Sequence, residues 1–457
     1  MLETEPDLSV FSQIDFTNGA VAAVSGGSDS TALLLLIKDH LDRSAPATKL
    51  LAVTIDHNLR PGSAAEAQAV ARLCAARGIA HRIMVWSGRK PSTGLPAAAR
   101  EARYRLLAEA AQAEGIGLIL TGHTADDQAE TVLMRHARQE GPREAGRGLA
   151  GMAPATLYDW RIWIARPLLG TRRAALREVL RRANVGWAED PTNDDEAFER
   201  PRIRAALADD NGAQRVADAV ALAARAAVER EQLGHRAAAL IRGFASRPAD
   251  GLIRLDPGFA TAGDEPAAVY ALRILLATVG GVAFLPDQAR SEALLDRLRA
   301  APFCATLSRT VVDARRAGIF LRRETRNLPP AAPAVDDALW DGRRRITLGD
   351  EPGAFLVAPL GAARAAKREI AEDGTPPSLV RAALAAKPVL WRSSVHPGES
   401  LGPVQDSPTL PRMAVCPVVA PFARFLPSFD LAPAGTVAAL IGAPLLPATP
   451  FSGHTAG

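Results

Sequence analysis

Short apolar runs alternate with longer segments along the first part of the chain. The runs predict β-strands at Val21–Val24, Leu50–Ile55, Arg82–Trp86 and Leu118–Thr121. A segment that predicts a helix follows each run: Thr31–Ile37, Ala64–Arg77, Leu95–Gly115 and Ala125–Arg138. Strands and helices that alternate in this way predict an α/β domain, with a parallel sheet covered by helices on both faces. Functional residues of such sheets are expected beyond the C-terminal strand ends.

The pattern is less regular in the rest of the chain. Residues 141–151 are Gly- and Arg-rich and are expected to form a loop, and strand and helix return over residues 161–187. Later predicted elements are helices at Asp218–Ile241, Ala267–Val279 and Ser291–Ala300 and strands at Arg309–Val312 and Gly318–Leu321. A proline-rich linker at Leu328–Pro333 then suggests three parts: an α/β domain at residues 1–204, a helical connector with a mixed α/β domain at residues 205–327, and a small, mainly β domain at residues 334–457.

The composition of the 457-residue chain, with 48% hydrophobic and 23% charged residues, is that of a globular protein. The longest uncharged apolar stretch, Ile274–Leu285, is too short to span a membrane, and the acidic N-terminus is unlike a signal peptide. The cysteines Cys74, Cys304 and Cys416 lie far apart, which argues against a CxxC redox, iron–sulfur or zinc-ribbon site. We therefore expect a cytoplasmic protein without membrane contact.

The sequence SGGSDS at Ser25–Ser30 lies between the first predicted strand and the first predicted helix. Two glycines let the backbone approach a ligand closely, and successive N–H groups at a helix start can bind an anion. No GK[ST] follows, so this is not a Walker A loop. The alternative is a Gly–Ser turn without a ligand, which the strand–loop–helix context disfavours.

Three polar residues, His123, Asp127 and Glu130, follow the fourth predicted strand. On a helix with about 100° per residue, offsets of four and seven turn back to within about 40° and 20° of His123, so all three would share one face. Two carboxylates and an imidazole can hold Mg²⁺, accept a proton or bind an ammonium group. The alternative is a solvated helix start, where acidic residues favour the helix dipole.

Other polar residues lie at the ends of strands or on the long helix. Asp56 and His57 end the second strand, where an adenosine could bind, although Asp56 could equally cap the next turn. Arg100 and Arg103 lie one helical turn apart and could neutralise phosphates, with a plain surface position as the alternative.

Positive charge is concentrated in the stretch Arg135–Arg182, which has eleven arginines and four acidic residues, whereas the whole chain carries a formal charge of only +4. Such a surplus beside a nucleotide site suits a phosphate-bearing macromolecule such as RNA. The alternative is a solvated helix face over Arg172–Arg182.

The loop at Ser25–Ser30 resembles that of the PP-loop ATP pyrophosphatases, which bind ATP and transfer AMP to a substrate with release of pyrophosphate. Further segments, in their order and spacing, resemble the tRNA(Ile)-lysidine synthetases in particular. These segments are DHNLRPGS at Asp56–Ser63, AREARY at Ala99–Tyr104, GHTADDQAET at Gly122–Thr131, and EDPTN at Glu189–Asn193 followed by Arg200, Arg202 and Arg204. The resemblance covers residues 21–204. At one position the chain departs from it, because family members often have a second histidine where this chain has Thr124.

The resemblance implies a Rossmann-like PP-loop ATP pyrophosphatase fold for the α/β domain and tRNA binding for the C-terminal parts. It also implies an activity: ligation of free L-lysine to C2 of the wobble cytidine of tRNA(Ile) with a CAU anticodon. The reaction would pass through an adenylated tRNA and release AMP and pyrophosphate. ATP is then a substrate, and Mg²⁺ is the expected cofactor.

The motifs and the resemblance together assign candidate roles to individual residues. The ATP-binding group is Ser25, Gly26, Gly27, Ser28, Asp29, Ser30, Asp56, His57 and Gly122. The catalytic group is Asp29, Arg103, His123, Asp127 and Glu130, and the Mg²⁺ ligands are Asp29 and Asp126. The tRNA-binding group is Arg172, Arg173, Arg200 and Arg204.

Two other functions are compatible with the loop alone. A tRNA thiolase of the same superfamily would need paired catalytic cysteines or an iron–sulfur site, which three scattered cysteines disfavour. A non-catalytic nucleotide-binding regulator would not need the aligned His123, Asp127 and Glu130. The sequence leaves open which of these groups is the base, which tRNA features are read, and whether the chain forms a homodimer.

Overall fold

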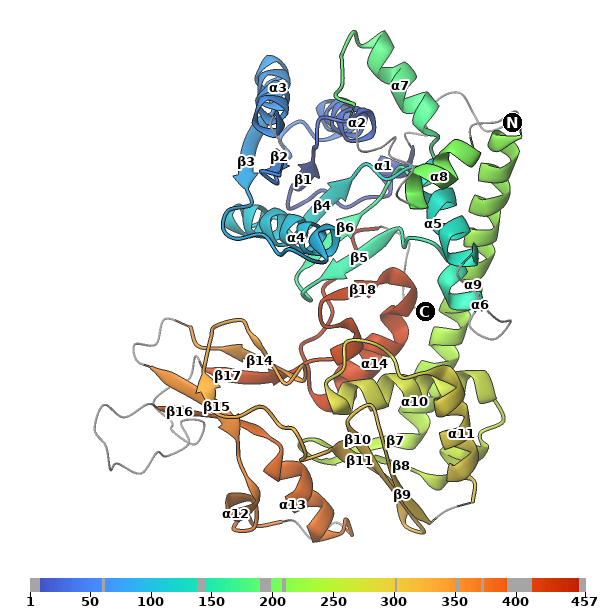
Figure 1. Cartoon of the computed structure of the whole chain (residues 1–457), viewed down its shortest axis with the longest axis vertical. Coiled ribbons are helices and arrows are strands. Elements are labelled where there is room, and N and C mark those ends of the chain that lie inside the picture. The colour runs from blue at the N-terminus through green and yellow to red at the C-terminus, as the bar shows by residue number, and fades with distance from the viewer. Residues whose placement is uncertain are drawn as a thin grey trace. The chain divides into compact units, whose positions relative to one another are not determined.

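The structure is a computed structural model that describes residues 9–59, 62–137, 145–189, 199–207, 211–300, 302–349, 354–370, 374–392 and 413–451. The chain folds into two compact units (Figure 1). The first consists of Met1–Arg230 with the returning segments Pro427–Phe429 and Pro447–Gly457, and the second of Glu231–Leu426 and Asp430–Leu446. The expected division into three parts, at residues 204 and 327, stays a prediction.

A seven-stranded sheet forms the centre of the first unit. Its strands are β1 (Ala20–Ala23), β2 (Leu50–Asp56), β3 (Ala80–Val85), β4 (Leu118–Thr121), β5 (Ala155–Tyr158), β6 (Ile162–Ala165) and the short β18 (Phe425–Pro427). They lie in the order β18-β5-β6-β4-β1-β2-β3, and β6, β4, β1, β2 and β3 pair in parallel. Every residue of β4 is buried, as expected of a parallel strand covered on both faces.

Helices cover both faces of this sheet, as the sequence predicted. They are α2 (Ser28–Ser44), α3 (Ser63–Ala76), α4 (Leu95–Ala113), α5 (Ala125–Ala137) and α7 (Arg173–Arg182). Figure 1 shows α2 and α3 on one side of the strands and α4 on the other. The predicted fold class is therefore confirmed, with one addition: β5 pairs antiparallel with β6 at the edge of the parallel strands.

The order of the strands defines where a ligand site is expected. From β1 the chain proceeds to β2 and β3 on one side, and it then returns to β4 on the other side of β1. Crevices form at such a reversal, beyond the C-terminal ends of the two central strands. Residues 25–30 follow β1 and residues 122–124 follow β4, so the sheet brings both predicted motifs to this edge.

Shorter elements complete the first unit: α1 (Ser9–Ser12), α6 (Ala145–Leu149) and α8 (Glu199–Ala206). The expectation of a loop over residues 141–151 was wrong in part, because α6 lies within it. The long helix α9 (Gly212–Phe244) begins in the first unit and ends in the second. It matches the predicted connecting helix but is longer at both ends.

The second unit begins with an antiparallel sheet of five strands and two helices. The strands, in the order β7-β8-β11-β10-β9, are β7 (Ala245–Ala249), β8 (Leu252–Leu255), β11 (Gly318–Arg323), β10 (Thr310–Arg315) and β9 (Phe303–Leu307). The helices are α10 (Glu265–Gly280) and α11 (Gln288–Leu298). Burial of most of α10 explains its nearly continuous apolar sequence.

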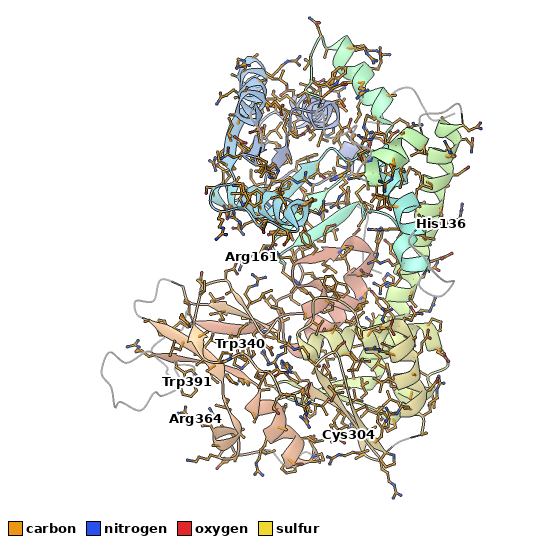
Figure 2. The ribbon with its side chains drawn as sticks, in the orientation of Figure 1. His136, Arg161, Cys304, Trp340, Arg364 and Trp391 are labelled. Carbon is orange, nitrogen blue, oxygen red and sulfur yellow. The ribbon has the colours of Figure 1, made fainter. Side chains whose placement is uncertain are left out.

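Two small antiparallel sheets follow in the same unit. One is β12 (Ala332–Pro333), β15 (Phe355–Pro359) and β16 (Pro388–Arg392), and the other is β13 (Leu339–Trp340), β14 (Arg344–Thr347) and β17 (Ala414–Pro417). Trp340 and Trp391 are buried in the apolar clusters of these sheets, and Arg364 lies over the Trp391 ring at 4.1 Å (Figure 2). Helices α12 (Ala362–Ala365), α13 (Pro377–Ala385) and α14 (Leu431–Ile441) complete the unit. No helix in the described part of the chain is long and apolar enough to cross a membrane.

Candidate active site

The loop between β1 and α2 has the form of an anion-binding site. Gly26 has φ +88°, a conformation that favours glycine, and Gly27 is the N-cap of α2 without a side-chain capping bond. Ser30 Oγ accepts from the Ser25 amide at 3.1 Å and donates to the Gly27 carbonyl at 3.2 Å, which fixes the turn. The first N–H groups of the helix thus carry no side-chain cap and suit a phosphate.

The end of β4 packs tightly against the start of α2. A Cβ placed on Gly122 would lie 2.8 Å from the carbonyl carbon and oxygen of Asp29, so only glycine permits this approach. The structure thereby brings the predicted residues Gly122 and Asp29 together. Asp29 Oδ1 accepts from Ser28 Oγ at 2.9 Å.

Helix α5 starts with a reciprocal capping box. Thr124 is the residue before the helix, and its amide and hydroxyl donate to Asp127 Oδ2 at 3.0 and 2.9 Å, while the Asp127 amide donates to Thr124 Oγ1 at 3.3 Å. Because α5 begins at Ala125, the expectation that His123 lies on the helix was wrong. His123 belongs to the segment before the cap, where its Nδ1 pairs with Thr121 Oγ1 at 2.9 Å.

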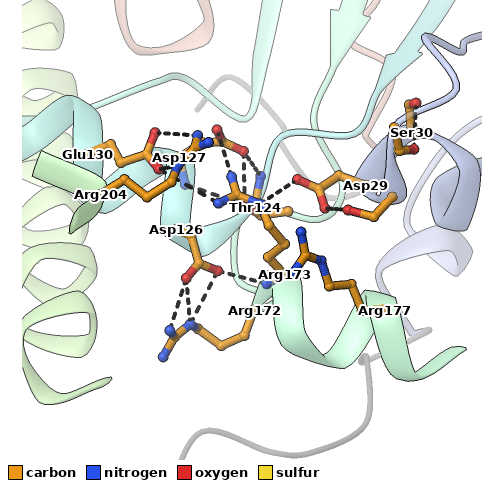
Figure 3. A network of polar contacts seen from close by, with 12 residues as sticks. Asp29, Ser30, Thr124, Asp126, Asp127, Glu130, Arg172, Arg173, Arg177 and Arg204 are labelled. Atoms are coloured by element: carbon orange, nitrogen blue, oxygen red, sulfur yellow. Dashed lines mark hydrogen bonds and ion pairs between the residues drawn. The ribbon is translucent and has the colours of Figure 1, made fainter. Parts of the chain in front are cut away.

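Arg173, the first residue of α7, joins the loop after β1 to helix α5 (Figure 3). Its guanidinium donates from Nε to Asp29 Oδ2 at 2.9 Å and from Nη2 to Asp127 Oδ1 at 3.2 Å. Its Nη1 lies 3.7 Å from Glu130 Oε1. One partly buried cation therefore holds three carboxylates from two elements in one place.

Glu130 is 1% exposed and has two further cationic partners on α8. Arg200 Nε lies 2.8 Å from Glu130 Oε2, and Arg204 Nε lies 2.9 Å from Glu130 Oε1. Arg200 also approaches Asp127 at 3.6 Å. We define Asp29, Asp127 and Glu130 as the carboxylate cluster. Arg200 and Arg204, two of the four arginines predicted to bind tRNA, are thus engaged at this cluster in the structure.

Asp126 has a different position from these three carboxylates. Arg172 donates to it from Nη2 at 2.9 Å and from Nε at 3.1 Å, and the Arg173 amide donates to its Oδ2 at 2.7 Å (Figure 3). The carboxylate thus stabilises the N-terminus of α7, where four backbone N–H groups lack partners within the helix. Both of its oxygens are engaged, so this arrangement gives no support to Asp126 as a Mg²⁺ ligand, and that assignment stays a prediction.

The charges of the cluster shift one another's pKa values. Burial raises the pKa of Asp29, with Arg173 opposing it. Burial alone would also raise the pKa of Asp127, but Arg173, His123 and the Thr124 amide lower it below its usual value. Burial disfavours the charged form of Arg173, yet Asp127 and Asp29 raise its pKa above the usual value. The Arg173–Asp127 pair is therefore ionised over the whole physiological range.

A second group of charges surrounds His123. Burial, followed by the positive charge of Arg166, lowers the pKa of His123 to about 3, and Arg103 and Arg100 add to the effect. Arg166 is 6% exposed and donates to the Ala153 carbonyl and to Thr156 Oγ1. His123 is thus a neutral imidazole at neutral pH. Arg166, Arg103 and Arg100 together place positive charge near His123, which favours the binding of anionic groups.

The neutral state of His123 predicts a pH effect on stability. Its unfolded pKa is about 6.5, so the unfolded chain takes up the proton first as the pH falls, and stability is lost from about pH 6.5 downward. Between pH 7.5 and 5.0 the wild type should lose on the order of 2 kcal/mol more unfolding free energy than His123→Gln, as measured with urea. His136→Gln, at an exposed position on α5, is the control and should behave as wild type. Equal losses in wild type and His123→Gln would contradict a buried neutral imidazole.

Asp56 and His57 lie at the same edge of the sheet, at the end of β2. The Asp56 carboxylate accepts from the Asn58 amide at 2.8 Å, which is the capping role considered from the sequence. His57 lies edge-on to Trp86, and its Nδ1 has no partner among the described residues. Burial and then Arg103 lower the pKa of His57. An unpaired ring nitrogen fits the predicted contact with an adenosine, which stays a prediction.

Some predicted segments lie outside the described residues. These are residues 60 and 61 of DHNLRPGS and residues 190–193 of EDPTN. The described residues contain no group of three or more His, Cys, Asp or Glu side chains arranged to hold a metal ion. Mg²⁺ often binds through one or two carboxylates together with substrate phosphates. Both oxygens of Asp29 are engaged too, by Ser28 and Arg173, so its assignment as a Mg²⁺ ligand also stays a prediction.

The family of the chain follows from its sequence relatives. Residues 7–211 match the PP-loop domain family. Over 459 aligned positions that span both proteins completely, the chain is 70% identical to a tRNA(Ile)-lysidine synthase of Mesorhizobium japonicum. The chain belongs to the tRNA(Ile)-lysidine synthase family. A tRNA(Ile)-lysidine synthase of Rhizobium meliloti is 38% identical over 94% of this chain and 93% of its own length, and one of Brucella ovis is 42% identical over 75% and 76%.

Membership of the tRNA(Ile)-lysidine synthase family confirms the resemblance on which the site residues were chosen. The structure adds residues that the sequence did not single out for this site. Arg173 was assigned to tRNA, yet it lies between the carboxylates, and Arg166 was counted only as part of a basic stretch. Thr124 carried a recognisable signal, because T-x-x-D before a helix is a capping pattern. The ion pairs of Arg173 join residues up to 144 positions apart, so no local pattern could reveal them.

Proposed function

We propose that the chain ligates L-lysine to C2 of the wobble cytidine of tRNA(Ile) with a CAU anticodon. ATP would first adenylate the C2 oxygen of the base with release of pyrophosphate, and the ε-amine of lysine would then displace AMP. The observation that carries the proposal is that the loop at residues 25–30 and the carboxylate cluster are joined by one guanidinium, that of Arg173. The names of the relatives support the same activity.

The first step is assigned to the loop after β1. Backbone N–H groups at the start of α2 would bind ATP phosphates, and Asp56 and His57 would lie near the adenosine. Mg²⁺, held by Asp29 and phosphate oxygens, would supply charge neutralisation for the pyrophosphate. Arg103, whose positive charge helps to lower the pKa of His123, would contact a phosphate or the adenylated base.

The second step needs an anionic site for the lysine ammonium and a group that takes its proton. Asp127 and Glu130 already bind guanidinium groups, which supports a site for an organic cation. The ammonium must become neutral before it attacks, so a proton acceptor is required. His123, with a pKa of about 3, and Asp127, whose pKa lies below its usual value, are both weak acceptors, so these pKa shifts favour neither group as the base.

The tRNA would bind through the arginines of the stretch Arg135–Arg182 and of α8. Arg172 and Arg173 are largely buried in their ion pairs. Arg181 and Arg182 at the end of α7 pair with Glu178, whose side chain is itself partly exposed, so this end is the better place to test. Arg181 and Arg182 are each 60% exposed there. Reaction in the cytoplasm, where ATP, lysine and tRNA are found together, completes the proposal, and a homodimer stays a prediction.

Charge reversal at Arg181 and Arg182 should weaken tRNA binding several-fold and lower the slope of log affinity against log salt by about 2, because each arginine that contacts a phosphate contributes about 1. Affinity for ATP should be unchanged. Filter binding between 50 and 200 mM salt, on the order of physiological strength, measures both quantities. The control is the double reversal of two exposed arginines, Arg72→Glu in α3 and Arg77→Glu at its C-cap, which should leave the slope unchanged. If both variants and the wild type have the same slope of log affinity against log salt, Arg181 and Arg182 of α7 do not contact the tRNA.

The function is tested by following pyrophosphate and AMP separately. We expect pyrophosphate release to depend on the CAU tRNA(Ile), and AMP release to depend on both tRNA and lysine. A tRNA thiolase would release AMP without lysine and require a sulfur donor. A non-catalytic regulator would bind ATP and release neither product. Either of these results would reject the proposal.

A further inference from the structure

A cavity within the second unit has features of a ligand site that the proposed reaction does not use. Its volume is about 40 Å³, and its polar lining comes from Arg247, Asp250, Thr278, Arg343 and Arg344. A water molecule needs about 10–15 Å³ of such space, so the cavity holds three to four water-sized atoms, on the scale of a small oxyanion. It is therefore large enough for a tetrahedral anion.

The hydroxyl of Thr278 is the first sign of a missing ligand. Thr278 lies in the last turn of α10, lines the cavity and is 4% exposed. Its Oγ1 has no hydrogen-bond partner among the described residues. Leaving such a buried hydroxyl unpaired costs about 1–3 kcal/mol, so a partner within the cavity is expected.

The second sign of a missing ligand is a surplus of positive charge at the cavity and in the ion-pair group around Asp341, which includes the lining residue Arg343. The Asp341 side chain is fully buried and is bound by three guanidinium groups, those of Arg309, Arg323 at 3.0 Å and Arg343 at 2.8 Å. Arg323 and Arg343 are themselves buried. Burial, together with the neighbouring Arg323 and Arg344, lowers the pKa of Arg343 to about 10, although Asp341 opposes the shift. One carboxylate does not compensate three arginines.

A second ion-pair group lies next to the first. Asp250 is paired with Arg344 and with Lys387, the latter at 3.1 Å. Arg247 adds another cation and donates to the carbonyl of Ile441. Of these groups, Arg247, Arg343, Arg344 and Asp250 line the cavity, a formal surplus of +2. The other members, Arg309, Arg323, Lys387 and Asp341, do not line it and add a further +2. The C-terminal ends of α10 and α14 offset this by only roughly 0.5 charge each.

We propose that this cavity binds a phosphate group through Arg343, Arg344 and the Thr278 hydroxyl. Arg343 donates from Nε to Asp341 and from Nη2 to the Ala386 carbonyl, and Arg344 donates from Nη2 to Asp250. The remaining N–H groups of both guanidinium groups can each donate to a phosphate oxygen, and the hydroxyl can donate to a third oxygen. The surrounding walls are apolar, with Leu252 and Val279 among them, so the anion would bind without its hydration shell. The group is a free phosphate or the terminal phosphate of a nucleotide. The inference does not depend on the proposed function.

The test is a calorimetric titration of the full-length chain with inorganic phosphate in the presence of a saturating non-hydrolysable ATP analogue, which occupies the loop at residues 25–30. We expect saturable binding of one phosphate that persists with the analogue. Thr278→Val preserves the shape of the side chain and should weaken the affinity about fivefold, and Arg344→Gln about tenfold. Arg316→Gln, at an exposed position, is the control and should leave the affinity unchanged.

Competition experiments distinguish the two possible ligands, a free phosphate and the terminal phosphate of a nucleotide. A 5′-phosphorylated dinucleotide that displaces phosphate, while its 5′-hydroxyl form does not, identifies a terminal nucleotide phosphate, and failure of both identifies the free anion. Any of three results would overturn the proposal: loss of phosphate binding when the ATP analogue is present, an unchanged affinity in both Thr278→Val and Arg344→Gln, or the absence of saturable binding.

Discussion

Replacement of Arg173 by methionine is expected to lower the free energy of unfolding by about 3–5 kcal/mol and to slow pyrophosphate release at least about a hundredfold. The reason is that the guanidinium is shared by Asp29, Asp127 and Glu130. Without it, Asp29 loses its cationic partner and the other two carboxylates retain only partners from α8. Leaving a partly buried carboxylate without its counter-ion costs more free energy of unfolding than the intact ion pair contributes.

Arg177→Met is the matched control, one turn further along α7. Arg177 pairs at 3.4 Å with Glu189, whose side chain is 72% exposed, so its loss should cost less than about 1 kcal/mol. Urea unfolding at pH 7.5 and a pyrophosphate-release assay at saturating tRNA measure both effects, and saturation keeps any tRNA contact of Arg177 out of the comparison. Similar, small losses in the two variants would show that Arg173 does not organise the site. If Arg173→Met is unstable but its folded fraction is fully active, the guanidinium serves the fold alone.

Replacement of Glu130 by glutamine is expected to slow lysine transfer about 10- to 100-fold while adenylation of the tRNA is affected less. The carboxylate is 1% exposed and binds the guanidinium groups of Arg200 and Arg204, so it is a site for cations in the structure as it stands. The amide has the same shape but no charge, and it attracts a lysine ammonium less. Asp29 is the carboxylate assigned to Mg²⁺, so the first step does not depend on Glu130 for its metal ion.

Pre-steady-state kinetics that resolve pyrophosphate release from AMP release measure the two steps of Glu130→Gln. The control is Glu109→Gln, at an exposed i,i+4 pair with Arg105 on α4, which should change neither step. If pyrophosphate release slows first, Glu130 acts on ATP or its metal ion. Wild-type rates in both steps would exclude a catalytic role for Glu130.

The parallel strands and their helices were predictable because a strand that is buried on both faces has an almost continuously apolar sequence. β1, β2 and β4 are nearly continuous apolar runs, and the strand β4 was placed at its observed bounds. The loop SGGSDS was recognisable for a similar reason, since two glycines between a strand and a helix serve a close backbone approach. The φ of +88° at Gly26 is a conformation that favours glycine, while the ligand that the loop would bind stays a prediction.

Other features were missed, one because a local signal was overlooked and the rest because they depend on contacts between distant parts of the chain. His123 precedes α5 because Thr124 and Asp127 close the capping box, a local signal that an even helical projection overlooks. Arg173 has the charge of a tRNA contact, and only the folded chain places it among carboxylates. In the second unit several strands have two to four residues, too few for a periodic pattern, so the small sheets gave no clear signal.

Attachment of lysine to the wobble cytidine is detected by incubating the protein with ATP, isotopically labelled lysine and a tRNA(Ile) transcript with a CAU anticodon, followed by digestion and mass spectrometry of the nucleosides. We expect one labelled lysine on the cytidine of the anticodon, formed only with ATP and absent from a transcript in which that cytidine is replaced by uridine. Transfer of AMP to the tRNA without any lysine-bearing nucleoside, or labelling of both transcripts alike, would contradict this expectation.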